Sequence, residues 1–275
     1  MSEIYLKAKE YYLNNNISLT KLSKMFKIDR GNFSKFLKNN GVEIINKQNQ
    51  QTIIGNYFEK IDSEEKAYWL GFMYADGNVS KNSNNIEISL KPGDINHLRK
   101  FAKTINFTNK ISVSNTRCRL CFANKQMKQD LINNGCIPAK SLILKYPKIN
   151  NNLIIHFIRG YFDGDGCITF NQNKHHRPTI SILGTKDTLD YISKNLTGHV
   201  KKLRGNHGSD VTFVLEYTGQ LSRDLLFKLY ENSNIYLDRK FERFSLLKLA
   251  LQDRKVLDAL SKYGRTPKQE NTVVS

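Results

Sequence analysis

The sequence carries an internal repeat, and this repeat constrains the possible folds more than any other feature. Residues 69–77 align with residues 158–166 at an offset of 89, and residues 126–131 align with residues 220–225 at an offset of 94. The two pairs keep their order along the chain, and the small growth in offset is what loop insertions in a duplicated domain produce. We therefore expect two copies of one ancestral unit.

Each copy predicts the same order of helices and strands. The alternation of Ile86, Ile88 and Leu90 is typical of a half-buried strand within a hairpin. The pattern indicates an α+β unit whose antiparallel sheet has one face covered by helices and the other available to a ligand. The predicted elements, given for the first and then the second copy, are a helix ending at Asp76 or Asp165, a hairpin over 78–91 or 167–184, a helix starting near Asp94 or Asp187, a hairpin over 110–123 or 200–217, and a helix starting near Gln126 or Gln220.

The first 45 residues predict a separate module of three short helices. Asp29 stands where it can cap a helix that begins at Arg30, and the turn before it lacks the glycine often found there. A three-helix packing module without DNA contact is one interpretation. The other is a helix-turn-helix, whose last helix would present to a DNA major groove Arg30, Asn32, Ser34 and Lys35.

Composition sets the remaining boundaries. Between residues 43 and 62 the chain is polar and rich in asparagine and glutamine, which favours a linker. The predicted segments are a helix-turn-helix-like module over 1–45, a linker over 46–62, the first repeat over 63–148, the second repeat over 149–252 and a C-terminal tail over 253–275.

The positive charge of the chain favours a polyanionic partner. Lys and Arg number 43 against 25 Asp and Glu, a net charge of +18. Each phosphate that a basic side chain neutralises releases condensed counterions, so nucleic acid is the first candidate and a merely basic soluble protein is the alternative. No apolar run approaches the roughly 18 residues that span a bilayer, so we expect a soluble intracellular protein without a membrane partner.

Small residues recur four positions apart in both repeat segments. Gly71 and Ala75 share one face of the first predicted helix, and Gly160 and Gly164 share one face of the second. Such faces let two helix backbones approach closely. If the two helices pack against each other, a pseudo-twofold axis relates the halves and brings the helix ends together.

An aspartate stands at each of these ends. Asp76 and Asp165 each precede a glycine, which suits a left-handed residue that closes a helix. A carboxylate at a helix C-terminus is unfavourable by up to about 1 kcal/mol, and two neighbouring carboxylates repel each other further. A divalent cation removes both penalties, because carboxylates and terminal carbonyls are oxygen ligands that Mg²⁺ prefers. Two ordinary Asp-Gly turns are the alternative, but they leave the matched small residues unexplained.

The paired segments resemble the two motifs of the LAGLIDADG homing endonuclease family in its single-chain form, from about residue 64 to about residue 251. Trp69, Tyr74 and Arg159 depart from the family's letters, whereas the glycines, small residues and acids are kept. The resemblance implies an α+β fold of two pseudo-twofold-related αββαββα halves that form a DNA-binding saddle, with the small all-α module preceding them.

The same resemblance implies the metal ligands. Asp76 and Asp165 would bind Mg²⁺ or Mn²⁺ together with the main-chain carbonyls of Ala75 and Gly164. Asp163 matches an earlier motif aspartate that is generally not the catalytic one.

The family also places a lysine near the end of each half, close to the catalytic pocket. This implicates Lys140 and Lys240 as catalytic residues. A solvated lysine is the alternative in so basic a chain.

The implied activity is metal-dependent, site-specific hydrolysis of one phosphodiester on each strand of duplex DNA, leaving short 3′ overhangs. The two sheets would lie along the major groove on either side of the cut. The candidate sheet contacts are Lys81, Lys91, Arg117, Arg119, Lys174, Arg177 and Arg204, with Asn82, Asn84, Asn85 and Gln172 as candidate base readers.

Two other functions fit the same residues. One is an RNA maturase that assists intron splicing, with intron RNA as a second partner. The other is a sequence-specific DNA-binding regulator that does not cleave, for which we expect at least one motif aspartate to be replaced. Asp76 and Asp165 are both present, so the endonuclease is the first expectation, as a monomer whose two halves supply the symmetry.

Overall fold

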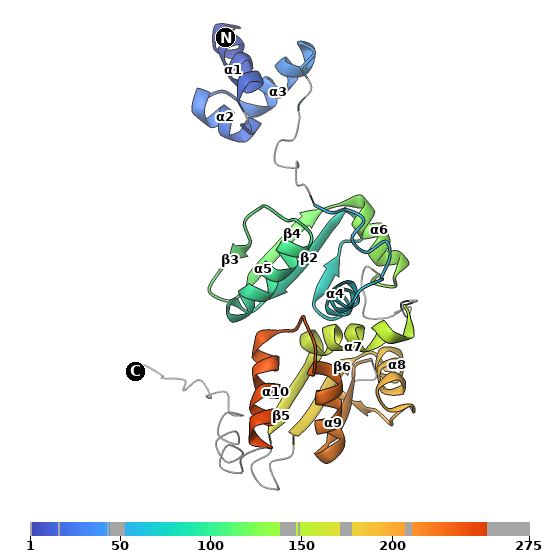
Figure 1. Ribbon diagram of the computed structural model, residues 1–275. Coiled ribbons are helices and arrows are strands. Elements are labelled where there is room, and N and C mark those ends of the chain that lie inside the picture. Colours follow the sequence, from blue (N-terminus) through green and yellow to red (C-terminus); the bar gives the residue numbers. More distant parts are fainter. Residues whose placement is uncertain are drawn as a thin grey trace, which may run out of the picture. The chain divides into compact units, whose positions relative to one another are not determined.

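The computed structural model describes residues 2–15, 17–42, 44, 53–137, 147, 149–170, 178–206 and 211–251 (Figure 1). The chain divides into two units: unit 1 comprises residues 1–52 with 107–109, and unit 2 comprises residues 53–106 and 110–275. The first part of the predicted linker and the predicted tail from residue 253 lie outside the described residues. Within the described residues, no helix has the length and apolar character needed to cross a membrane.

Unit 1 contains the three predicted helices. These are α1 (Ser2–Asn14), α2 (Leu19–Phe26) and α3 (Arg30–Asn39). The Asp29 carboxylate accepts a hydrogen bond from the Asn32 amide at 2.8 Å, so the predicted cap of α3 is confirmed. Lys27 follows α2 with a φ of 51°, the left-handed conformation that glycine often supplies in such a turn.

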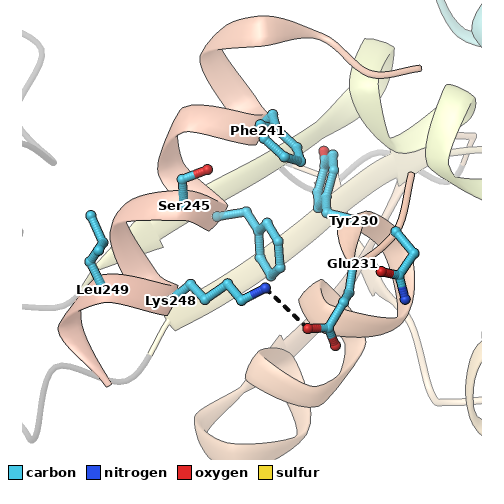
Figure 2. Close-up of a pocket in the computed structure, with 8 residues that line it drawn as sticks. Tyr230, Glu231, Phe241, Ser245, Lys248 and Leu249 are labelled. Atoms are coloured by element: carbon cyan, nitrogen blue, oxygen red, sulfur yellow. Dashed lines mark hydrogen bonds and ion pairs between the residues drawn. The ribbon is translucent and has the colours of Figure 1, made fainter. Parts of the chain in front are cut away.

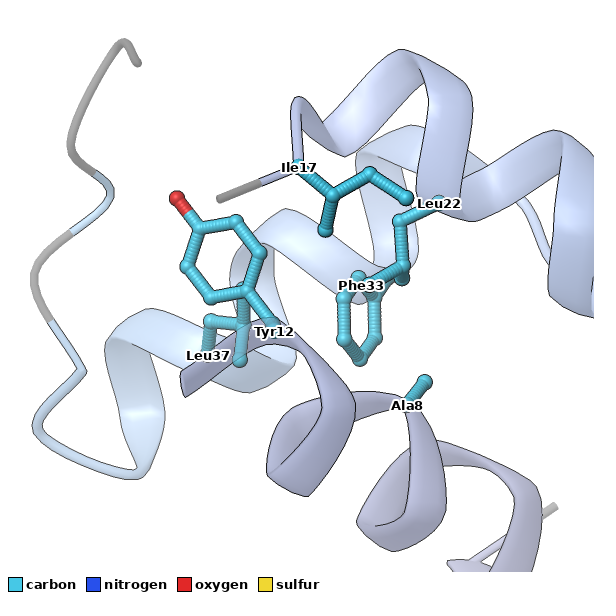
Figure 3. Packing of buried hydrophobic residues seen from close by; sticks show 6 residues of the cluster. All are labelled: Ala8, Tyr12, Ile17, Leu22, Phe33 and Leu37. Carbon is cyan, nitrogen blue, oxygen red and sulfur yellow. The ribbon is translucent and has the colours of Figure 1, made fainter. Parts of the chain in front are cut away.

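A small hydrophobic core holds these three helices together (Figure 3). The Tyr5 ring packs edge-on against Phe33 and Phe36 at its margin. Met25 of α2 is not part of this core and is exposed. The buried side chains of the core are Ala8, Tyr12, Ile17, Leu22, Phe33 and Leu37.

Unit 2 contains two halves with the predicted element order αββαββα, and the second half ends with one more helix. The first half consists of α4 (Glu64–Ala75), β1 (Gly77–Val79), β2 (Asn85–Leu90), the 3-10 turn η2 (Pro92–Asp94), α5 (Ile95–Thr104), β3 (Ser112–Val113), β4 (Cys118–Ala123) and α6 (Lys125–Asn133). The second half consists of α7 (Asn151–Asp165), β5 (Gly166–Phe170), β6 (Pro178–Gly184), α8 (Lys186–Thr197), β7 (Arg204–Gly205), β8 (Phe213–Thr218), α9 (Gly219–Tyr230) and α10 (Asp238–Ala250).

Each half builds one antiparallel sheet of four strands in its described part. The strand orders are β1-β2-β4-β3 and β5-β6-β8-β7, so the two sheets have the same topology. Gly77 pairs with Ile88 in the first sheet, and Gly166 pairs with Ile182 in the second. Helix α5 packs on β2 and β4, while α8 and α9 pack on β6 and β8. The buried side of each sheet is therefore the helix side, as the alternating strand pattern predicts.

Helices α4 and α7 pack against each other with their backbones in direct contact (Figure 1). A Cβ atom on Gly71 would overlap the Phe157 carbonyl oxygen. A Cβ atom on Gly160 would overlap the Tyr68 carbonyl oxygen. The two contacts are equivalent under the 89-residue offset, so the predicted pseudo-twofold relation of the halves is confirmed.

Alanine at Gly71 or Gly160 is expected to destabilise unit 2 by about 3 kcal/mol or more, because the added methyl group meets main-chain atoms that cannot move independently. This loss outweighs the roughly 1 kcal/mol by which alanine favours an isolated helix. Urea unfolding of each variant measures the change. Gly93→Ala is the matched control, since no atom lies within 4 Å of its added Cβ. Equal stability of all three variants would contradict the role of the close contact.

Candidate active site

The two motif aspartates end matched helices. Asp76 directly follows α4, and its amide donates to the Phe72 carbonyl at 2.9 Å. Asp165 is the last residue of α7, and the amide of Gly166 donates to the Phe162 carbonyl. Both aspartates are half-buried. The same local geometry thus presents one carboxyl group at the end of each packed helix.

The glycines after the aspartates are needed for space, and the expectation of a left-handed conformation is wrong. Gly166 has a φ of −92°, and Gly77 is not among the described glycines with positive φ. A Cβ atom on Gly77 would lie 2.7 Å from the Met73 carbonyl oxygen, and one on Gly166 would overlap the Phe162 ring and carbonyl oxygen. The chain passes too close to the preceding helical turn for any side chain.

Gly164 and Tyr161 of α7 lie near the motif carboxylates. A Cβ atom on Gly164 would overlap the Ala75 methyl group and lie 3.2 Å from Oδ2 of Asp76. The Tyr161 hydroxyl donates to the Leu183 carbonyl at 3.0 Å. Burial raises the pKa of Tyr161, and the negative charges of Asp165 and Asp76 raise it further. Both aspartates therefore act electrostatically on the same phenol.

The donor set suits a hard divalent cation. The predicted ligands are the two carboxylates and the main-chain carbonyls of Ala75 and Gly164, and Gly164 lies beside the Asp76 carboxylate. Among the described residues, no cluster of three or more His, Cys, Asp or Glu side chains lies ready to hold a metal ion. An ion at this place would depend on two side chains plus main-chain, water or substrate oxygens, which is the usual environment of Mg²⁺.

A pocket of about 420 Å³ opens beside Asp76 and Gly164. Its wall is basic, although Asp94 also contributes to it. The basic residues that line it are Lys91, Arg117 and Arg239. Lys91 and Arg117 were predicted DNA contacts, whereas sequence reasoning missed Arg239, whose one signal was its position directly before Lys240.

A second pocket, of about 450 Å³, lies between α9 and α10 (Figure 2). Aromatic rings of Tyr230, Phe241 and Phe244 form much of its wall, and Lys248 pairs with Glu231 at 3.1 Å on its rim. Neither motif aspartate lines this pocket.

Lys240 lies within the interior of the second half. Its Nζ donates to the carbonyls of Phe162 and, at 2.8 Å, of Asp163, which belong to the last turn of α7. Only 1% of the residue is exposed. Burial lowers the Lys240 pKa to about 8, against the partly compensating charge of Asp163. The ammonium group thus binds the main chain of the motif helix just before Asp165. Lys140, the predicted counterpart of Lys240 in the first half, lies outside the described residues.

Asp163 is buried and hydrogen-bonded within the protein, which agrees with its expected non-catalytic role. It is fully buried and accepts hydrogen bonds from Tyr68 at 2.7 Å, from Tyr230 at 2.5 Å and from the Leu237 amide at 2.7 Å. Burial raises the Asp163 pKa. The matched residue of the first half, Tyr74, donates instead to the Asn134 carbonyl.

Arg159, which departs from the motif letters, joins the two halves. Its guanidinium is buried and donates to the Ile235 carbonyl at 2.9 Å and the Leu229 carbonyl at 3.1 Å. It also pairs with Glu64 at the start of α4 at 2.6 Å. Burial acts to raise the Glu64 pKa, but hydrogen bonds from Asn234 and the charge of Arg159 lower it overall. The substitution thus has a structural explanation.

The predicted DNA contacts that the structure describes are on the surface. Arg119 pairs with Glu87 at 2.5 Å on the sheet face opposite α5, and Arg204 lies 3.9 Å from Glu216. In unit 1, Arg30, Asn32 and Lys35 are exposed and Ser34 is half-buried. The exposed candidates of unit 2 are Lys81, Asn82, Asn84, Asn85, Lys91, Arg117, Arg119 and Arg204. Those that lie outside the described residues are Gln172, Lys174 and Arg177.

Solved structures of LAGLIDADG homing endonucleases have the same fold. The structure of I-GzeII in complex with its DNA target is 11% identical, covers 74% of this chain and 99% of its own, and gives a TM-score of 0.53. I-LtrWI bound to target DNA is 14% identical, covers 73% of this chain and 96% of its own, and gives a TM-score of 0.50. I-SmaMI bound to uncleavable DNA is 9% identical, covers 74% of this chain and 98% of its own, and gives a TM-score of 0.51.

The chain therefore has the LAGLIDADG homing endonuclease fold, and the resemblance drawn from the paired motifs is confirmed at the level of fold. No protein-family model matches the sequence, and no curated protein matches it either. At these identities the backbone arrangement is what the proteins share.

The buried Lys240 predicts a specific pH dependence of stability. Its folded-state pKa of about 8 lies below the value of 10.5 expected for an unfolded chain, so between these values the folded protein binds fewer protons. The Lys240 contribution to the free energy of unfolding must then rise with pH across this window, by about 3 kcal/mol in total. The measurement is the unfolding free energy of the wild type minus that of Lys240→Met, from pH 7 to pH 10.5.

Lys248→Met is the control, because Lys248 lies on the same helix with its side chain half exposed. Its difference from the wild type should show no comparable rise. A flat Lys240→Met difference would show that the amine keeps an ordinary pKa.

Proposed function

We propose that this protein is a metal-dependent, site-specific endonuclease that cuts both strands of duplex DNA. The observation that carries the proposal is the close contact of α4 and α7 through Gly71 and Gly160, two helices that carry Asp76 and Asp165 at their matched C-terminal ends. The solved relatives in fold are homing endonucleases bound to DNA targets, which supports the same substrate class here.

The chemistry assigned to this site is hydrolysis. Water adds across one P–O ester bond on each strand, which gives a phosphate monoester and a hydroxyl end, with short 3′ overhangs. Asp76 and Asp165, with the carbonyls of Ala75 and Gly164, would hold Mg²⁺ or Mn²⁺, which when bound supplies Lewis acidity and lowers the pKa of water. Lys91 and Arg117 on the pocket wall would bind the phosphate backbone.

The DNA would lie along the open faces of the two sheets. These faces carry exposed basic and amide side chains, among them Arg119, Asn85 and Arg204, opposite the helices that bury the other face. One chain supplies both halves of the pseudo-twofold arrangement, so we propose a monomer. The exposed side of α3, with Arg30, Asn32 and Lys35, is proposed as an additional major-groove contact.

Asp76→Asn and Asp165→Asn are each expected to lower the rate of double-strand cleavage by more than about 100-fold while leaving DNA binding largely intact. The loss follows because an amide keeps the size of the side chain but removes its charge. The assay exposes a randomised duplex library to the protein with Mg²⁺, with Ca²⁺ or with a chelator, and sequences the cut ends. Asp224→Asn, at an exposed position on α9, is the control.

Recurrent cuts at one long site in the wild type, absent from both motif variants and from the chelated sample, would support the endonuclease. Selective retention of DNA without cutting would instead favour a regulator, and selective retention of a structured intron RNA would favour a maturase. Loss of folding in both variants would make the aspartates structural.

Removal of residues 1–45 is expected to weaken DNA affinity and to reduce its salt dependence, since each lost phosphate contact lowers the slope of log affinity against log salt by about 0.9. The triple variant Arg30→Ala, Asn32→Ala, Lys35→Ala should reproduce most of the effect within the full chain. Lys7→Ala serves as control, because Lys7 is exposed on α1 and pairs with Glu3 at 2.9 Å. An unchanged affinity and slope in the truncated protein would show that unit 1 does not contact DNA.

A further inference from the structure

Two basic residues of the pocket beside Asp76 have uncharged counterparts in the second half. Lys91 lies three residues after Ile88, and Thr185 lies three residues after Ile182, which holds the same place in the second sheet. Arg117 and Thr212 likewise lie three residues before the matched strand residues Leu120 and Leu215. Two threonines therefore correspond to the two basic residues of the pocket beside Asp76.

Arg239 adds a third basic group to this pocket, and it comes from the other half. It lies in the first turn of α10, yet its Nε donates to both carboxylate oxygens of Asp94, at 3.2 and 3.1 Å. The Asp94 side chain is 11% exposed, whereas that of Arg239 is 52% exposed. The carboxylate thus anchors the guanidinium, and both residues line the pocket.

The segment before Arg239 is tightly held, so its position is well defined. The Leu237 amide donates to the buried Asp163 carboxylate at 2.7 Å. Lys100 on α5 donates to the Tyr236 carbonyl at 3.2 Å and to the Asp238 carboxylate at 2.5 Å. These contacts fix the start of α10 against the first half, and Arg239 cannot swing away without breaking the Asp94 pair.

The first half has no arginine at the position aligned with Arg239. In the alignment of the two halves, Arg239 precedes Lys240, whereas Ala139 precedes Lys140. Together with the two threonine replacements, all three basic residues of the Asp76 pocket have uncharged counterparts in the alignment of the halves. A planar guanidinium with several N–H donors is suited to bind a phosphate group through more than one hydrogen bond.

We propose that Arg239 binds a backbone phosphate in the Asp76 pocket and thereby promotes cutting of one DNA strand selectively. This inference rests on the proposed endonuclease function. The two cuts would then depend on different residues. Cutting of one strand requires Arg239, Lys91 and Arg117, whereas the residues aligned with these three in the other half are uncharged.

The test uses the whole 275-residue chain. One substrate is a supercoiled plasmid that carries one copy of the site recovered from the library. The other is a linear duplex labelled on either strand. Arg239→Ala is expected to slow cutting of one strand by roughly 10- to 100-fold, the range for loss of a charged hydrogen bond, and to leave the other strand within about threefold. Nicked circles should then accumulate, always with the same strand intact.

Two further variants make the result decisive. Lys248→Ala removes the same charge from the same helix, at a residue paired with Glu231 on the second pocket, and should leave both strands unaffected (Figure 2). Asp94→Asn removes the anchor but keeps the arginine, and should slow the same strand as Arg239→Ala. Thermal unfolding of each variant confirms that it is folded.

The outcomes separate the two proposals. A wild-type protein that cuts no duplex overturns the endonuclease, and the role of Arg239 falls with it. A wild-type protein that cuts, combined with Arg239→Ala and Asp94→Asn proteins that slow both strands equally or neither, overturns the role of Arg239 alone. Selective slowing of one strand in both variants supports it.

Discussion

The structure of unit 2 depends on the direct contact between the backbones of α4 and α7. Gly71 and Gly160 each lie against a carbonyl group of the opposite helix, so the two helices cannot carry larger residues at these places. This single contact sets the axis that relates the halves, and it also sets the distance between the helix ends. The site therefore follows from the packing: the same small residues that let the helices meet place Asp76 beside Gly164.

The pseudo-symmetry is broken by polar groups buried on one side. Asp163 and Arg159 of α7 have Tyr74 and Leu70 as their counterparts under the repeat offset. A buried carboxylate or guanidinium costs several kcal/mol unless hydrogen bonds satisfy it. Asp163 has three such partners, and Arg159 binds Glu64 and two carbonyls. These groups connect α7 to α4, α9 and the segment before α10. The glycines allow the two helices to approach, and the buried hydrogen bonds favour one particular arrangement of them.

The pocket beside Asp76 has basic side chains from both halves, and the Asp94 carboxylate fixes one of them in place. Positive charges gathered in one concave place produce a stronger local potential than the same charges dispersed over a surface. Duplicated halves can thus keep a common backbone while their side chains diverge.

The sequence by itself determined the two-half α+β architecture, because periodic apolar residues and the repeated Gly and Asp positions act within single helices and strands. Long-range packing decided the rest. The sequence did not indicate that Lys240 points into the interior, that Arg159 joins the halves, or that Arg239 reaches across to Asp94. Each of these depends on segments at least 70 residues apart coming together, and side-chain direction is set there by burial and hydrogen bonding rather than by local pattern.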